Sequence, residues 1–146
     1  MAFAGCGLSL SVHAITLLGF HSKALLDLQL GLFLGVFPVF LAAVLAQQRL
    51  LSEFSQLDRF KLGNKMWRVI VARTPKWLRT LSYVLMGYAL ALFAVFAYLN
   101  FRNESASELD EIRLMSAYSA AFYTAAAMVL VSYVESEHPL GRDEIR

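Results

Sequence analysis

Residues 81–99 read LSYVLMGYALALFAVFAYL, an unbroken run without Asp, Glu, Lys or Arg. A helix that crosses the roughly 30 Å hydrocarbon core of a bilayer needs about 20 predominantly apolar residues. Three more uncharged stretches of similar length lie at residues 2–20, 28–46 and 114–134. We therefore expect an all-α integral membrane protein with four transmembrane helices in a bundle.

The composition agrees with this class of protein. The chain has 146 residues, of which 58% are hydrophobic and only 16% are charged, whereas soluble domains average about 45–50% apolar and about 25% charged residues. The charged residues lie between and beyond the four stretches. Four helices joined as hairpins leave no room for a second core, so we expect a single transmembrane domain over residues 1–146.

The distribution of Lys and Arg predicts the orientation, because short cationic loops stay on the cytoplasmic side. The segment 47–80 holds eight cationic and two acidic residues, a net charge of +6, whereas the connector 100–113 has a net charge of −2. We expect segment 47–80 to be a cytoplasmic loop. With four spans, the N-terminus and the tail, residues 135–146, are then cytoplasmic as well.

The cationic segment is expected to be amphipathic and to lie on anionic lipid. Residues 47–61 continue the second helix in polar form, and Gly63-Asn64 indicates a break. Residues 65–73 mix hydrophobic side chains with cations, which favours a helix in the headgroup layer over a solvated loop. Thr74 and Pro75 are expected to be the N-cap and the first residue of the third span. The expected lipid-surface contacts are Lys65, Trp67, Arg68, Arg73, Lys76, Trp77 and Arg79.

Small residues recur on each apolar stretch at spacings of three and four. Helices in lipid associate through such residues, because they let two backbones approach closely. The expected packing positions are Gly31 and Gly35, four residues apart in the second stretch, and Gly87 in the third. Pro38 should bend the second helix, because it removes the hydrogen bond to the carbonyl of Leu34.

His13 is the only histidine or charged residue within the four stretches, and it lies on one helix face with Ser9 and Thr16. An ionisable group inside a membrane is a candidate functional residue. Its depth matches that of Tyr123, so we expect His13 to face Tyr123 or a Ser or Thr of the bundle. The alternative is a neutral core histidine with satisfied hydrogen bonds.

The chemistry of the common cofactors has little support in this sequence. Haem needs axial ligands at matched depth, and His13 has no such partner unless two copies of the chain share it. The histidines and Cys6 lack the spacing of a metal site, and no phosphate-binding glycine loop is present. We expect no catalytic residues, no cofactor, no metal and no nucleic-acid partner.

Four runs resemble a group of small bacterial inner-membrane proteins that have no assigned function. They are GLSLSVH at 7–13, TPKWLR at 74–79, MGYA at 86–89 and SAYSAAFY at 116–123. The resemblance implies a bacterial protein of the cell (inner) membrane. It implies no activity, cofactor or site residue.

The function expected from these features is that of a non-enzymatic accessory, assembly or interaction protein of the membrane. Its partners would be anionic lipid at the cytoplasmic face and another membrane protein or a second copy of the chain. One alternative is a small oligomeric transporter or pore with His13 lining the path. Another is a redox-linked membrane subunit.

The predicted orientation can be tested by labelling introduced cysteines with a membrane-impermeant maleimide. A cysteine placed in the segment 47–80 should be protected in intact cells and should react only after permeabilisation. A cysteine in the connector 100–113 should react in intact cells. Labelling of the segment 47–80 from outside would overturn the assignment.

Overall fold

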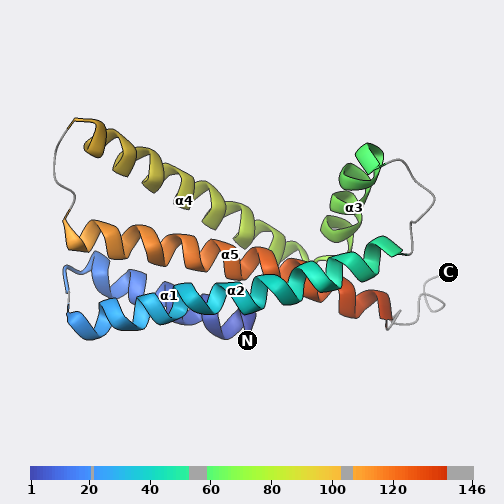
Figure 1. The fold of residues 1–146 in the computed structure, drawn as a ribbon, viewed down its shortest axis with the longest axis horizontal. Coiled ribbons are helices and arrows are strands. Elements are labelled where there is room, and N and C mark those ends of the chain that lie inside the picture. The colour runs from blue at the N-terminus through green and yellow to red at the C-terminus, as the bar shows by residue number, and fades with distance from the viewer. Residues whose placement is uncertain (21, 53–58, 103–106, 138–146) are drawn as a thin grey trace.

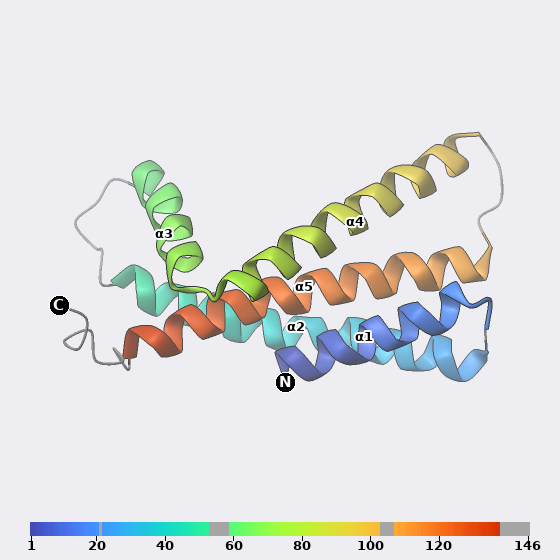
Figure 2. The same cartoon turned by 180° about the vertical axis from the view of Figure 1, so that it is seen from behind.

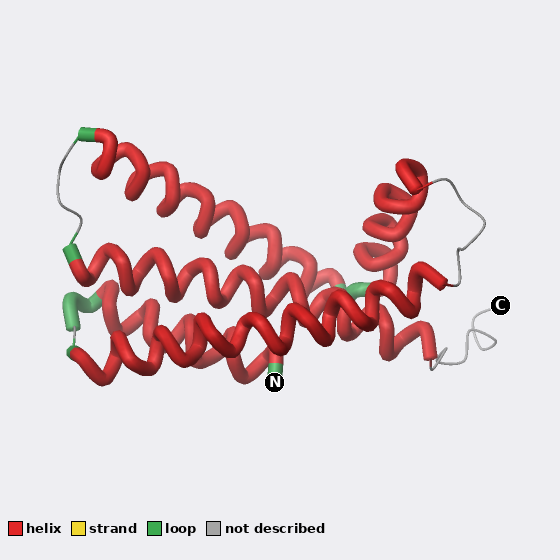
Figure 3. Tube along the Cα trace, in the orientation of Figure 1, coloured by secondary structure: helices red, strands yellow, loops and turns green. Residues whose placement is uncertain are grey.

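The computed structural model describes residues 1–20, 22–52, 59–102 and 107–137. Over these residues the regular structure consists of α-helices, which confirms the expected all-α class. The helices are α1 (Ala2–Leu17), α2 (Lys23–Ser52), α3 (Arg59–Arg73), α4 (Lys76–Phe101) and α5 (Glu108–Glu137). Helices α1, α2, α4 and α5 lie side by side in an elongated arrangement, with α3 near one end (Figures 1 and 3).

Three helices are long and apolar enough to cross a membrane, namely α2, α4 and α5. The first predicted span, residues 2–20, is a shorter apolar helix of 16 residues. At 1.5 Å per residue it is about 24 Å long, less than the hydrocarbon core. The predicted span was too long because it included residues after the end of α1. These residues form a turn in which Gly19 has a φ of 85°.

Helix α5 is the centre of the structure, because each of the other four helices packs against it. Helix α2 runs parallel to α5, whereas α1 and α4 run in the opposite direction (Figure 1). Helices α2 and α5 have 30 residues each. They extend past the beginning of α1 and α4, and α3 stands beside this extension (Figures 1 and 2).

Small side chains explain why α5 holds this position. Within its apolar segment 56% of the residues are buried, against 17% in α2 and 11% in α4. Ala120, Ala121 and Ala127 have at most 1% of their surface exposed, and Ser116 and Ser119 have none. Small residues permit close helix contacts in lipid, where burial of apolar surface gives no driving force between helices.

Helix α4 departs from a regular four-helix bundle. Its first half packs on α5 through the buried residues Leu78, Leu85 and Ala89. Figures 1 and 2 show that α4 then leans away from α5 towards the connection between them. Leu90 and Val95, in its second half, are more than half exposed. The bundle is therefore packed together where α4 begins and is open where α4 ends.

The amphipathic segment forms a helix, as expected, but the predicted break at Gly63-Asn64 is wrong, because both residues lie inside α3. A glycine within a helix costs only about 1 kcal/mol relative to alanine. Burial of a side chain such as Ile70, which is 2% exposed and packs with Met66 and Val71, contributes about 1.5–3 kcal/mol. Tertiary packing therefore outweighs the local preference.

The predicted N-cap role of Thr74 is also wrong. Its hydroxyl donates a hydrogen bond to the carbonyl of Ile70, 2.7 Å away, at the end of α3. The same hydroxyl lies 3.4 Å from the carbonyl of Met128 on α5. Pro75, and not Thr74, is the N-cap of α4. Thr74 instead joins the end of α3 to α5.

The glycines expected at helix contacts have different surroundings. A Cβ atom at Gly35 would lie 2.7 Å from the hydroxyl of Tyr123, so this glycine allows a close contact between α2 and α5. A Cβ atom at Gly31 or Gly87 would meet nothing within 4 Å. These two glycines therefore make no close helix contact within the described chain. Gly5 of α1 lies against the ring of Tyr123.

Gly5→Ala should destabilise the protein by about 1–3 kcal/mol, because an added methyl group overpacks a tight contact. The new Cβ would lie 2.5 Å from the Tyr123 ring, which cannot move freely because its hydroxyl is bonded to the carbonyl of Leu32. Gly7→Ala on the same helix is the control, since its Cβ meets nothing within 4 Å. Thermal unfolding in detergent measures both variants, and equal melting temperatures would contradict the contact.

Candidate functional site

His13 lies on the buried face of α1 and joins three helices. Its Nδ1 is 2.8 Å from the Oγ of Ser116 on α5, and its Nε2 is 2.8 Å from the hydroxyl of Tyr88 on α4. The rings of His13 and Tyr88 meet edge to face, with centroids 5.3 Å apart. His13 is only 6% exposed. Both ring nitrogens are therefore paired inside the protein.

The hydrogen-bond network assigns the proton of a neutral His13. The hydroxyl of Ser116 donates to the carbonyl of Arg113, 2.9 Å away, so its single proton is already used. Ser116 Oγ then accepts a hydrogen bond from Nδ1–H of His13. Nε2 carries no proton in this tautomer and accepts from the hydroxyl of Tyr88. Each member of the network is satisfied without a charge on the imidazole.

The sequence predicts that His13 faces Tyr123 or a Ser or Thr, and the contact between His13 and Ser116 confirms the second alternative. Tyr123 is 4% exposed and lies elsewhere on α5. Its hydroxyl donates to the carbonyl of Leu32 on α2, at 2.8 Å. Ser9 and Thr16 are fully buried on the same face of α1 as His13. The four residues of the expected polar site thus share one helix interface without forming one cluster.

Arg113 on α5 holds the end of α1. Its Nε and Nη2 donate to the carbonyl of Thr16 at 3.2 and 2.9 Å. Its Nη1 forms an ion pair with Asp110 at 3.3 Å. A cation at a helix C-terminus compensates the carbonyl groups that lack an intrahelical partner. The guanidinium group therefore stabilises the last turn of α1 through a residue almost 100 positions later in the chain.

Asp110 has a second role at the beginning of α5. Its Oδ2 accepts hydrogen bonds from the hydroxyl of Ser107 at 2.6 Å and from the backbone N–H of Ser107 at 3.2 Å. The N–H of Asp110 donates in return to Ser107 Oγ at 3.2 Å. This reciprocal pair is a capping box, with Asp in the place of the usual Glu. It fixes the start of α5, and with it the position of Arg113.

Gln29 is a buried polar residue that sequence reasoning missed. It has no exposed surface, and its Nε2 donates to the Oγ of Ser119 on α5 at 3.0 Å. Its Oε1 and the Oγ of Ser9 are buried, and neither has a hydrogen-bond partner among the described residues. Gln29 is uncharged, so a pattern of ionisable residues does not include it. The signal was the presence of an amide side chain within an apolar stretch.

The expected lipid-surface residues gather where α3 meets α4. Trp67 and Trp77 are 46% and 60% exposed, and Arg68 and Lys76 are exposed as well. Arg79 donates from Nη1 to the carbonyl of Val71 at 3.3 Å, which ties the two helices together. Arg73 is half-buried, and its Nη1 lies among protein atoms without a partner. Lys65 lies in α3, and its side chain is outside the described part.

The chemistry available in this arrangement is limited. Among the residues described, no group of three His, Cys, Asp or Glu side chains could hold a metal ion. In this tautomer Nε2 of His13 would have to give up its bond to Tyr88 before it could bind a ligand or accept a proton. The polar network therefore connects helices and offers no free donor or acceptor at the imidazole.

Comparisons with known proteins add no family assignment. No family model matches the chain, and neither a curated protein nor a solved structure shows a significant similarity to it.

A double-mutant cycle between His13 and Tyr88 tests the network. His13→Leu and Tyr88→Phe should each destabilise the protein, and their interaction energy should be about 0.6–1.7 kcal/mol, the range for hydrogen bonds between transmembrane helices. Unfolding in mixed micelles gives the free energies.

The matched control pairs Tyr88→Phe with Ser11→Ala. Ser11 is exposed on α1 and its hydroxyl bonds to the carbonyl of Gly7 in its own helix, so no coupling is expected. Additive effects of the His13 and Tyr88 substitutions would show that the contact contributes nothing to stability.

Proposed function

We propose that the protein is a non-enzymatic interaction protein of the cell (inner) membrane, whose uncovered helix faces bind another membrane protein or a second copy of the chain. The basic α3–α4 junction would lie on anionic lipid at the cytoplasmic face, with both termini on that side. The observation that carries the proposal is the very unequal burial of the three long helices.

Helices α2 and α4 leave most of their surface uncovered. Only 17% and 11% of their apolar segments are buried, although α5 is 56% buried. Lipid tails can cover such surfaces, but a glycine gives no advantage in contact with lipid tails, and two glycines are uncovered. A glycine in a helix costs about 1 kcal/mol relative to alanine, and Gly31 and Gly87 make no close contact within the part of the chain that the structure describes. Close approach by a partner helix would supply that contact.

The α3–α4 junction supports the orientation. Each Lys or Arg near an anionic leaflet contributes about 1 kcal/mol of attraction. Arg68, Arg73, Lys76 and Arg79 lie within one short region together with the exposed Trp67 and Trp77, and aromatic residues beside cations are typical of the membrane–water interface. These charges would hold α3 at the surface on the cytoplasmic side.

The surroundings of His13 argue against the two alternatives. Transport through His13 needs water or substrate to reach the imidazole, which is 6% exposed. A redox role with haem needs a free ring nitrogen, and both nitrogens are bonded to side chains. A structural role for His13 agrees with this geometry, because buried polar groups normally have hydrogen-bond partners.

Gly31→Leu and Gly87→Leu test the proposal without disturbing the fold, because both positions face open space. The protein is purified from its membrane in mild detergent and the associated proteins are identified by mass spectrometry. We expect a stoichiometric partner, or a dimer of the chain, that is lost in one or both variants, because a leucine would separate the two backbones.

Ala97→Leu is the control, since Ala97 is an exposed residue of α4 at a different angle around the helix from Gly87. It should retain the partner. A wild-type protein that is monomeric and free of other proteins, with variants that behave identically, would contradict the proposal.

A further inference from the structure

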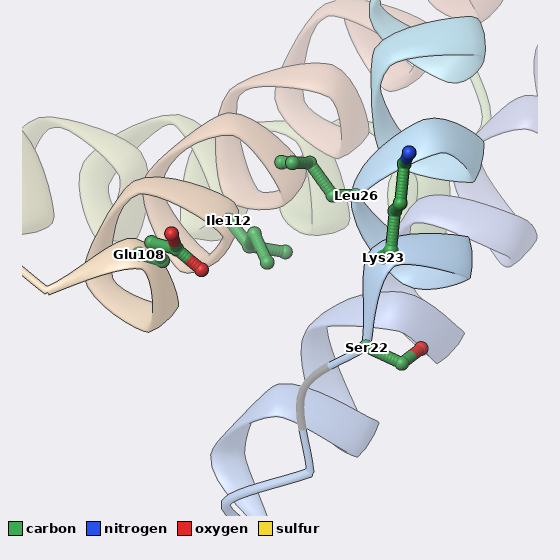
Figure 4. A pocket seen from close by; sticks show the side chains of 5 residues that line it. All are labelled: Ser22, Lys23, Leu26, Glu108 and Ile112. Atoms are coloured by element: carbon green, nitrogen blue, oxygen red, sulfur yellow. The ribbon is translucent and has the colours of Figure 1, made fainter.

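A hollow with charged side chains, which we call the polar hollow, lies between the beginnings of α2 and α5. It measures about 330 Å³ and is lined by Ser22, Lys23 and Leu26 beside α2 and by Glu108 and Ile112 on α5. Figure 4 shows the Lys23 ammonium group and the Glu108 carboxylate on opposite sides of the hollow, with Leu26 and Ile112 between them. The hollow therefore presents one positive and one negative group above an apolar floor.

A second hollow between the same two helices is completely apolar. It measures about 220 Å³ and is lined by Phe33, Val36, Phe37 and Phe40 of α2 and by Phe122 of α5. Phe37 and Phe40 are more than half exposed although they are large aromatic residues. This hollow has no group that could bind a polar ligand.

Helix periodicity places the two hollows on one side of the α2–α5 pair. Leu26, Phe33 and Phe37 are separated by seven and four residues, so they share one face of α2. Glu108 and Phe122 are separated by two heptads, so they share one face of α5. Because α2 and α5 run parallel (Figure 1), the polar hollow and the apolar hollow follow each other along this side of the helix pair, which we call the α2–α5 groove.

The length of this groove matches one leaflet of a bilayer. Leu26 and Phe37 are about 16 Å apart along α2, and Ile112 and Phe122 are about 15 Å apart along α5, at 1.5 Å per residue. Half of the hydrocarbon core measures about 15 Å. A molecule with its polar end between Lys23 and Glu108 would therefore reach the aromatic part of the groove with an acyl chain.

We propose that this groove binds one phospholipid with a zwitterionic, primary-ammonium headgroup, in the leaflet on the side of the α1–α2 connection. Lys23 pairs with the phosphate, Glu108 accepts hydrogen bonds from the ammonium group, and an acyl chain lies against Phe33, Phe37 and Phe122. The phosphate also lies at the N-terminus of α2, where the helix dipole favours an anion.

The lining of the groove favours a lipid over a protein helix. A partner helix packs closely where small residues admit its backbone, whereas this groove is lined by phenylalanine side chains that hold a backbone away. The inference requires a membrane location but no partner protein, and its residues lie apart from Gly31 and Gly87.

The test is native mass spectrometry of the full chain reconstituted in vesicles with equal parts of phosphatidylethanolamine, phosphatidylcholine and phosphatidylglycerol, then released in mild detergent. We expect one retained lipid per chain, enriched in phosphatidylethanolamine. Phosphatidylcholine has no N–H group to donate to Glu108, and phosphatidylglycerol has no cation. Glu108→Gln should reduce the enrichment about two- to fivefold, the range for an exposed ion pair.

Phe37→Ala should lower the total retention and leave the order of the three lipids unchanged. The controls are Asp27→Asn and Leu34→Ala, because both residues are exposed on α2 and neither lines the polar or the apolar hollow. Both controls should behave as the wild type. Absence of a retained lipid, equal retention of the three classes by the wild type, or a second protein chain bound at the groove would overturn the proposal.

Discussion

The structure depends on how closely helices can approach α5. In hydrocarbon, neighbouring helices gain nothing from excluding water, so they are held by close packing and by hydrogen bonds. Helix α5 provides both, with alanines at the contact surface and serines between them. His13 of α1 bonds to Ser116 and Gln29 of α2 bonds to Ser119. Each of these polar side chains crosses the interface where a small residue of α5 leaves room.

The same arrangement explains why α2 and α4 remain largely uncovered. One helix of about 10 Å diameter can surround itself with only a few neighbours, and the neighbours of α5 meet one another little. Helix α4 touches α5 along its first half and then diverges (Figure 2). The uncovered surfaces of α2 and α4 thus follow from an arrangement in which one central helix makes most of the contacts.

The sequence predicted the helical class, the three long helices and the buried face of α1. These features depend directly on the distribution of charged and hydrophobic residues along the chain. It failed where tertiary contacts decide the outcome. Gly63-Asn64 indicated a break, but α3 continues because Ile70 is buried against the core. Gly31 and Gly87 looked equivalent to Gly35, and only the structure separates the glycine that contacts Tyr123 from the two that face outwards.

The candidate site was predicted in part for the same reason. His13 stands out in any search for ionisable residues, but its partner Tyr88 lies on a helix face that periodicity did not single out. Gln29 carries no charge and escaped notice, although it is completely buried. Arg113 was counted as a connector charge, and its contact with the carbonyl of Thr16 depends on the path of the chain between residues 17 and 113.

The contacts of α1 also set an order of events during synthesis. The buried polar face of α1 is completed by Ser116 and Arg113, so α1 receives these partners only after α5 has been synthesised. At about 5–20 residues per second, α1 waits several seconds for α5 to emerge. During that interval Nδ1–H of His13 and the carbonyl of Thr16 lack the partners that α5 supplies. Docking of α5 then completes the hydrogen bonding of α1.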